Sequence, residues 1–440
     1  MKAAFYTLGC KTNQFESQAM EKLLLAKGYE IVPFDEEADV YIINSCTVTA
    51  TGDKKTRQTM RRIAALRPDA LVAVCGCYAE LSPQELEAIL PGRIVVGGNK
   101  DHTAFINKLH ERLTGHAQNE PVEENKPSPK GKHTFEKLPA GGISGRTRAL
   151  LKVQDGCCHY CSYCIIPYAR GTIRSLSIGD AISQAQALAA EGYREIVLTG
   201  IEISSYGKER PGGETLLTLT RSLCRAVPSV RFRLGSLWPL TVDTEFCRLL
   251  SKEKNLCPHF HLSVQSGSDG TLARMNRPYG VAELKAAIAN LRKYFPHAAI
   301  TADLICGFPG ETEEEFAETL AFLKEAVFSQ MHIFPYSPRP GTKAAKMDGQ
   351  HTRETKEARC KAAAAIAKEN KIAYLEAQKG RKLEVLFEEP LPSGRQGGHS
   401  ENYLMVEVES HRPLQGELHT VEIIGRQGQN LMGRLCSPDM

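Results

Sequence analysis

The chain has 440 residues, 42% of them hydrophobic, and a formal net charge of only +4. This length exceeds one ordinary core, so two or three domains are expected, and the mild charge does not by itself indicate a nucleic-acid partner. No uninterrupted apolar run reaches about 18 residues, and the N-terminus lacks the apolar stretch of a signal peptide. We therefore expect a cytoplasmic protein without a membrane partner, whose fourteen cysteines are reduced and serve a purpose other than disulfides.

Residues 1–115 alternate short β-rich runs with helical runs, which is the pattern of an N-terminal parallel α/β domain. Ser82 followed by Pro83 marks one helix start. Strands are expected at 2–8, 40–44, 71–74 and 94–96, and helices at 14–26, 54–66 and 83–89. In such a domain the carboxyl ends of the strands lie along one edge of the sheet.

A second α/β region, residues 146–370, follows a segment at 116–145 that is rich in Asn, Glu, Pro, Lys and Gly. The composition of that segment is typical of a mobile linker. About six β/α units favour a partial (β/α)6 barrel over a doubly wound sheet. The strands are expected at 149–154, 195–199, 231–234, 259–264, 299–305 and 331–335, and a long connecting helix at 355–378.

Residues 371–440 change in character again, to short alternating strands separated by glycine turns. This pattern predicts a small C-terminal β-barrel. The segment holds eight Lys or Arg against ten Asp or Glu, so any RNA contact there must use local patches or stacking. Its strands are expected at 383–387, 403–408, 416–424 and 431–435.

Three cysteines, Cys157, Cys161 and Cys164, follow the first strand of the central region. Three thiolates leave one position open on a tetrahedral zinc ion or on a four-iron cluster. An open iron is useful where the missing ligand is a cosubstrate. The alternative is a structural zinc ion that takes Cys158 or His159 as its fourth ligand.

This spacing at the start of a β/α barrel resembles the radical S-adenosylmethionine superfamily. The resemblance implies a [4Fe–4S] cluster that binds S-adenosylmethionine and splits it to a 5′-deoxyadenosyl radical, with Tyr163 near the adenine. The superfamily motif for the methionyl amino group belongs at the end of the second barrel strand, where Thr199 and Gly200 are our candidates. The literal Gly-Gly-Glu at 212–214 lies beyond that end, and we reject it.

Two polar residues near barrel strand ends, Arg233 and Gln265, are further candidates to contact the cosubstrate or an adenosine. Each is equally compatible with a satisfied polar residue of the barrel rim. The sequence leaves both interpretations open.

A second group of cysteines, Cys10, Cys46 and Cys77, lies just past three different predicted strands of the first domain. Parallel sheets place ligand sites outside the carboxyl ends of their strands, so these thiols can converge. Taken singly, each is better explained as a buried apolar cysteine. Cys75 is an alternative to Cys77, but its position assigns its side chain to the strand.

With this second triad the chain resembles the methylthiotransferase family over nearly its whole length except the linker. The resemblance implies a second [4Fe–4S] cluster that holds the sulfur, and two S-adenosylmethionine molecules, one as methyl donor and one as radical source. It also implies transfer to carbon 2 of an adenine, an N-terminal domain that caps the barrel, and a C-terminal RNA-binding barrel called the TRAM domain. The matching segments are 8–13, 44–49, 75–79, 154–157, 199–200, 262–267 and 303–311.

Members of this family modify threonylcarbamoyladenosine or isopentenyladenosine beside the anticodon of tRNA, or an aspartate of a ribosomal protein. Residues 11–17 and 46–49 are most similar to the threonylcarbamoyladenosine branch, although no physical argument from these residues selects the side group. The resemblance implies the anticodon loop of tRNA as partner. The chemistry also requires a reductase or flavodoxin-type electron donor and a sulfur donor.

Basic residues give partial support for an RNA substrate. Lys54, Arg57 and Arg61 share one face of the helix after Cys46 and could hold a phosphate, although such a face is as often merely solvated. A different class remains open, a non-enzymatic iron–sulfur protein that binds RNA or transfers electrons. Its cluster would normally have four protein ligands, and both triads lack an obvious fourth.

Overall fold

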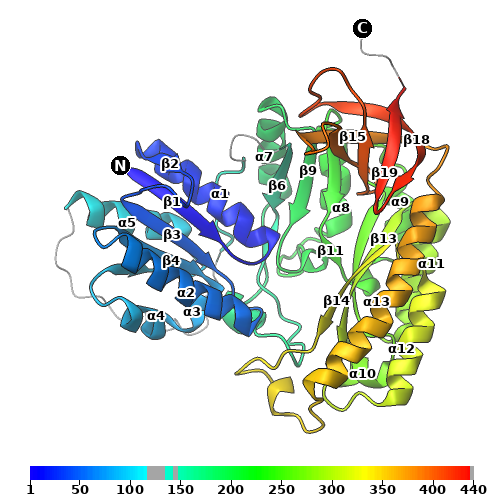
Figure 1. The fold of residues 1–440 in the computed structure, drawn as a ribbon, viewed down its shortest axis with the longest axis horizontal. Coiled ribbons are helices and arrows are strands. Elements are labelled where there is room, and N and C mark those ends of the chain that lie inside the picture. The colour runs from blue at the N-terminus through cyan, green and yellow to red at the C-terminus, as the bar shows by residue number, and fades with distance from the viewer. Residues whose placement is uncertain (116–133, 142–146, 437–440) are drawn as a thin grey trace.

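The computed structural model describes residues 1–115, 134–141 and 147–436, and these form three bodies (Figure 1). The N-terminal domain lies beside a central half-open barrel, and a small C-terminal barrel packs at one end of the central barrel. The predicted linker residues 116–133 and 142–145 lie outside the described residues. None of the described helices is long and apolar enough to cross a membrane.

The N-terminal domain is a five-stranded parallel sheet in the order β2-β1-β3-β4-β5, with helices on both faces. Strands β3 and β4 are buried almost throughout, as parallel strands between two helical layers must be. The short strand β2 and helices α3 and α5 are additional to the predicted elements. The strands are β1 Lys2–Thr7, β2 Glu30–Val32, β3 Val40–Ser45, β4 Leu71–Gly76 and β5 Ile94–Val96; the helices are α1 Lys11–Ala26, α2 Ala50–Leu66, α3 Cys77–Leu81, α4 Pro83–Ile89 and α5 His102–Thr114.

The central region is a partial barrel built from two parallel sheets, ordered β10-β9-β6 and β11-β12-β13-β14, which confirms the predicted partial barrel. A short antiparallel pair, β7 with β8, follows β6. Its strands are β6 Arg148–Lys152, β7 Gln154–Asp155, β8 Arg174–Ser175, β9 Glu195–Thr199, β10 Arg231–Leu234, β11 Ser236–Leu237, β12 His259–Gln265, β13 Ala299–Cys306 and β14 Gln330–Pro335. Its helices are α6 Ile166–Arg170, α7 Ile178–Ala190, α8 Leu216–Ala226, α9 Thr244–Leu250, α10 Asp269–Arg274, α11 Val281–Tyr294, α12 Glu313–Ala326 and α13 Arg353–Glu376.

The alternation of side chains along the barrel strands separates an apolar outer face from a polar inner face. Ile196 and Leu198 of β9 join the core formed with the outer helices. Because successive side chains point to opposite faces, Glu195, Val197 and Thr199 face inward. The inner face of the barrel therefore carries charged and polar groups, as a site for a polar ligand requires.

The C-terminal body is a closed five-stranded barrel in the order β15-β16-β17-β19-β18, which confirms the predicted small β-barrel. Strand β16 was not predicted, because apolar and polar residues do not alternate in its sequence, Gln-Gly-Gly-His-Ser. A Cβ atom on Gly398 would lie 2.4 Å from the Leu386 carbonyl oxygen, so the close approach of the paired strand β15 leaves room only for glycine there. The strands are β15 Lys382–Pro390, β16 Gln396–Ser400, β17 Met405–Val408, β18 Leu418–Gln427 and β19 Asn430–Leu435.

The N-terminal domain docks on the central barrel through helix α1. Phe15 packs with Leu150 and Val197 of the barrel and with Leu138, in the last part of the predicted linker. Leu138 is only 2% exposed, and Lys137 pairs with Asp180 of α7 at 2.7 Å. The expectation of a mobile linker is therefore wrong for residues 134–141, because an apolar side chain anchors them between the two domains.

Candidate functional site

The N-terminal cysteines come together at the carboxyl edge of the first sheet. Cys10 follows β1, Cys46 follows β3, and Cys77 follows β4 directly as the first residue of α3. A Cβ atom on Gly9, where φ is +103°, would lie only 2.9 Å from the Cys46 sulfur, so this turn requires glycine. Cys10 interacts electrostatically with both other thiols. The structure thus gathers the three predicted ligands, although Cys77 starts a helix instead of lying in a loop.

Cys75 lies in the core of the first domain. Its sulfur is fully buried, lies 3.9 Å from the Met20 sulfur and packs in the core against α1 and α5. Burial raises the pKa of the Cys75 thiol well above its usual value. The geometry therefore favours Cys77 over Cys75 as a ligand.

The central cysteines lie in the connection between β7 and α6. The Cys157 amide donates to the Gly171 carbonyl at 3.0 Å, and the Cys164 amide donates to the Cys161 carbonyl at 2.9 Å. These bonds fold the loop so that its thiols influence one another electrostatically. All three predicted ligands of the radical site thus belong to a single loop at the carboxyl end of the barrel.

His159, one of the two candidate fourth ligands of a zinc site at the central triad, is held by other contacts. The His159 imidazole lies 3.1 Å from the Glu202 carboxylate and stacks on Trp238 at 3.6 Å between ring centroids. These contacts already engage His159, and three thiolates alone leave one iron of a four-iron cluster open.

Burial favours the neutral form of two of these thiols. Burial raises the pKa of Cys77 to about 12, against the opposing effect of Arg170, and burial raises that of Cys157 to about 12. Both thiols are therefore neutral near pH 7 without a metal, and a bound cation would deprotonate them.

One arginine donates to a cysteine sulfur in each triad. The Arg277 Nη1 lies 3.1 Å from the Cys161 sulfur, and the Arg170 Nε lies 3.2 Å from the Cys77 sulfur. Hydrogen bonds to ligand sulfurs stabilise the thiolate and set the reduction potential of a cluster. Arg277 belongs to the same domain as its cysteine, whereas Arg170 reaches from the central barrel into the N-terminal domain.

Arg170 belongs to a buried ionic network that crosses the interface between these domains. Its guanidinium bonds to the Glu16 carboxylate, which also pairs with Lys152 at 2.7 Å. Asp155 pairs with Lys152 at 2.8 Å and with Arg174 at 3.0 Å. Burial alone would raise the pKa of Glu16, but Arg170 and Lys152 outweigh it and lower that pKa to about 2. The ion pairs therefore hold the two triads in one assembly.

The predicted cosubstrate residues lie at the carboxyl ends of barrel strands. Thr199 ends β9 and is buried, and a Cβ atom on Gly200 would lie 2.8 Å from the Gln154 carbonyl oxygen. Gln265 ends β12 with φ of +68°, where the register to β13 shifts. Such strain in a residue other than glycine is typical of functional positions. Tyr163, beside Cys164, packs edge-on against the Phe308 ring.

The rejected Gly-Gly-Glu segment lies in an exposed turn before α8. Gly212 and Gly213 both have positive φ, and Glu214 pairs with Arg210 at 2.7 Å. This placement agrees with assigning the cosubstrate to the end of β9.

Arg233 is held by structural contacts. Its guanidinium donates to the Glu195 carboxylate at 2.7 and 3.0 Å, and to backbone carbonyls of Ser400 and Glu401 in the C-terminal barrel. Arg231 makes similar bonds, so the two arginines fasten the C-terminal barrel to the amino end of the central one. A contact between Arg233 and the cosubstrate stays a prediction.

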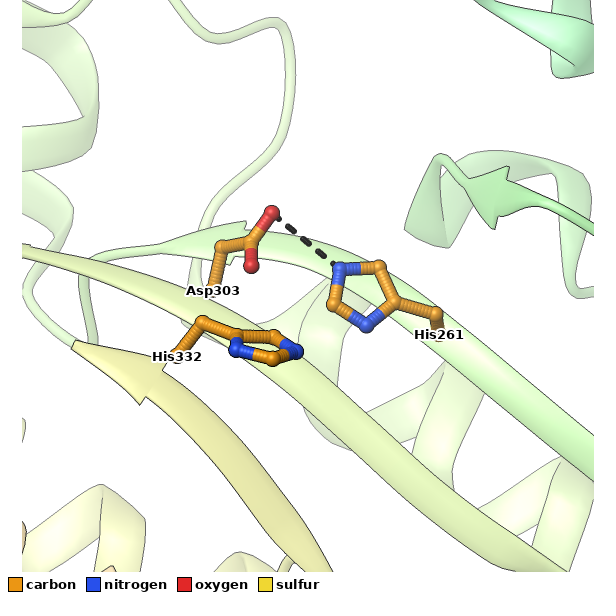
Figure 2. Close-up of side chains that lie close together, drawn as sticks. All are labelled: His261, Asp303 and His332. Atoms are coloured by element: carbon orange, nitrogen blue, oxygen red, sulfur yellow. Dashed lines mark ion pairs between the residues drawn. The ribbon is translucent and has the colours of Figure 1, made fainter. Parts of the chain in front are cut away.

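A third polar group lies on the inner face of the barrel, where His261, Asp303 and His332 project from strands β12, β13 and β14 (Figure 2). Their ligand atoms lie within 4.8 Å of one another, and the His261 Nε2 is 3.1 Å from the Asp303 carboxylate. Thr301 holds the His261 Nδ1 at 2.9 Å. This group could hold a divalent cation or donate hydrogen bonds to a substrate. The three residues occupy inward-facing positions on three adjacent strands, and this is the sequence pattern that could have revealed the group.

The sequence interpretation missed Arg170 and Arg277. Neither has a local signal, because each partner sulfur lies far away in the sequence. Their positions in the fold alone reveal them.

Comparisons with known proteins agree with this architecture. Residues 2–97 match a family described as Uncharacterized protein family UPF0004, and residues 151–323 match the Radical SAM superfamily. A radical S-adenosylmethionine structure from Kitasatospora setae, the methyltransferase TsrM, shares the fold with a TM-score of 0.55 at 13% identity, covering 78% of this chain and 77% of that chain. Residues 151–323 thus form a radical S-adenosylmethionine domain, and this superfamily uses S-adenosylmethionine and a [4Fe–4S] cluster.

Curated relatives define the family more closely. The threonylcarbamoyladenosine tRNA methylthiotransferase MtaB of Bacillus subtilis is 37% identical, over 96% of this chain and 93% of its own length. The MtaB proteins of Aquifex aeolicus and Thermotoga maritima are 37% and 36% identical, over 94% and 99% of this chain and 98% and 96% of their own lengths. The chain belongs to the MtaB family of methylthiotransferases.

Proposed function

We propose that the protein transfers a methylthio group to carbon 2 of N6-threonylcarbamoyladenosine beside the anticodon of tRNA. The observation that carries the proposal is the pair of cysteine triads on two docked domains, joined by Arg170. The names of the curated relatives support the substrate. Transfer to isopentenyladenosine or to a ribosomal-protein aspartate is the alternative within the family.

The residues of both triads fit the expected clusters. A cluster on Cys157, Cys161 and Cys164 would supply reductive cleavage of S-adenosylmethionine, and a second on the N-terminal triad would supply sulfur. Thr199, Gly200 and Gln265 orient the cosubstrate at the strand ends, with Tyr163 beside the adenine. Arg277 and Arg170 donate to ligand sulfurs, and helix α1 excludes water by packing against the inner face of the barrel.

The RNA contact that we propose begins on helix α2, which follows Cys46. Lys54 and Arg61 are exposed there, whereas Arg57 is tied to Tyr78 at 2.6 Å and to Glu85 at 3.2 Å. Exposed lysine and arginine beside the N-terminal triad suit the phosphates of an anticodon loop. A reductase or flavodoxin-type protein would deliver electrons, and a separate sulfur donor would restore the N-terminal triad.

Mass spectrometry of tRNA nucleosides tests the substrate. We expect a deletion strain to lose 2-methylthio-N6-threonylcarbamoyladenosine and to accumulate the unmethylthiolated nucleoside, with recovery by the wild-type gene. Loss of the methylthio form of isopentenyladenosine instead would assign the protein to the other tRNA branch. Absence of 5′-deoxyadenosine from reduced, anaerobic protein with S-adenosylmethionine would favour the non-enzymatic alternative.

A further inference from the structure

A cavity of about 510 Å³ opens where all three bodies meet. Helix α1 contributes Lys11 and Gln14, the central barrel contributes Arg148 and Arg233, and the C-terminal barrel contributes Tyr403 among other residues. The volume lies within the range of about 300–1,000 Å³ that is usual for small-molecule pockets. No residue of either cysteine triad lines it.

The cavity carries one positive charge without a counter-ion. Arg148 pairs with Glu388 at 2.8 Å, and Arg233 pairs with Glu195 at 2.7 Å. Among the described residues, no carboxylate lies within ion-pair distance of the Lys11 ammonium, and Lys11 is exposed to the cavity. The arrangement is electrostatically incomplete, and an anionic group would complete it.

Two further cations lie near Lys11 in this cavity. Arg233 and Arg148 line the same cavity as Lys11. Both guanidinium groups also lie over the Tyr403 ring, at 4.8 and 5.2 Å from its centroid. A carboxylate bound here would relieve the repulsion among the three cations.

The position of the cavity matches one part of the proposed substrate. Lys11 follows Cys10 directly, so their Cα atoms are about 3.8 Å apart. Arg148 begins β6, so the cavity lies toward the amino ends of the barrel strands, whereas the cosubstrate residues Thr199 and Gln265 lie at the carboxyl ends. An adenine held with carbon 2 near the N-terminal triad would lie between them, and its N6 substituent could enter the cavity.

We propose that Lys11 binds the carboxylate of the N6-threonylcarbamoyl group and so selects this acceptor. The inference deepens the proposed function, on which it rests. A threonylcarbamoyl group carries a carboxylate at neutral pH, whereas an isopentenyl group is uncharged, so a cation without a partner discriminates between the two. Lys11 is thus a specificity-determining residue, while Arg148 and Arg233 shape the positive cavity.

The test compares binding of three fluorescent anticodon stem-loop RNAs to the reconstituted enzyme with S-adenosylmethionine. One RNA carries threonylcarbamoyladenosine, the second its methyl ester, and the third unmodified adenosine. We expect the acid to bind at least about 10-fold more tightly than the ester, as a hydrogen bond between charged groups implies. Equal affinity of the wild-type enzyme for acid and ester would overturn the proposal without any substitution.

The variants assign the effect to one side chain. Lys11→Met should lose about 10-fold affinity for the acid and almost none for the ester, and Lys11→Arg should keep the preference. Lys27→Met, at the far exposed end of the same helix, is the control for net charge. An equal loss on both RNAs would show that Lys11 binds an RNA phosphate, which contradicts the proposal. A preserved acid preference in an enzyme that forms no methylthio product would overturn the proposed function alone.

Discussion

The two cysteine triads differ in how the chain assembles them. Cys157, Cys161 and Cys164 share one loop, and their supporting Arg277 comes from the same domain. Cys10 and its partners come from three strand ends, and their supporting arginine comes from the neighbouring domain. The central triad is therefore self-contained, whereas the N-terminal triad is complete only when both domains are docked.

The largest expected effect is on the central triad. Replacement of Cys157, Cys161 and Cys164 together by Ala should lower bound iron from about eight to about four per chain, since each triad would hold a four-iron cluster. Formation of 5′-deoxyadenosine should stop, as measured by chromatography after anaerobic reconstitution. If cleavage of S-adenosylmethionine persists, the radical site lies elsewhere.

The matching substitution in the N-terminal triad separates sulfur delivery from radical formation. With Cys10, Cys46 and Cys77 replaced by Ala, 5′-deoxyadenosine should still form, because its ligands are local to the barrel. The methylthiolated nucleoside should disappear, since a misplacement of even about 1 Å is costly to a reaction between bound groups. If mass spectrometry still detects the methylthiolated nucleoside, the N-terminal triad has only a structural role.

Arg170 tests the dependence of one triad on domain docking. Arg170→Met should cost about 1–3 kcal/mol of unfolding free energy, because the buried Glu16 carboxylate loses one of its two cationic partners and keeps Lys152. It should also weaken iron retention at the N-terminal triad, whereas Arg277→Met should affect only the central triad. Denaturant titration and iron counts on single-cluster variants provide the measurement, and equal iron loss at both triads would contradict the comparison.

The pH dependence of stability should report the same interface. Folding lowers the pKa of Glu16 from 4.5 to about 2, so its contribution is present above pH 4.5 and is lost as pH falls toward 2. The shift corresponds to about 3 kcal/mol. Between pH 6 and pH 3, the denaturation midpoint should fall less steeply in Glu16→Gln than in the wild type. Equal slopes of midpoint against pH would show that Glu16 does not cause the pH dependence.

The smallest effect is expected at Cys75, the residue next to the triad in sequence. Cys75→Ala should retain all iron and cost only about 1 kcal/mol of stability, because it removes one sulfur from a packed core. Cys77→Ala should lose the N-terminal cluster. If Cys75→Ala loses iron and Cys77→Ala retains it, the cluster ligand is Cys75.

The sequence by itself determined much of the fold and both groups of cysteines. The strands 195–199 and 231–234 and the helix 83–89 coincide with the observed β9, β10 and α4, because apolar periodicity and Pro83 are local signals. The central triad followed from the close spacing of its three cysteines, and the N-terminal triad followed from strand ends, since a parallel sheet gathers its carboxyl ends at one edge.

Only the tertiary structure decided what surrounds those cysteines. Arg170 reaches Cys77, Leu138 anchors the end of the linker, and Lys11 lines a cavity that the C-terminal barrel helps to form. Strand β16 likewise exists because its neighbours supply the hydrogen bonds. Periodicity records which face of one element is buried, but a pairing between domains depends on how the separate elements dock, and no local pattern records that geometry.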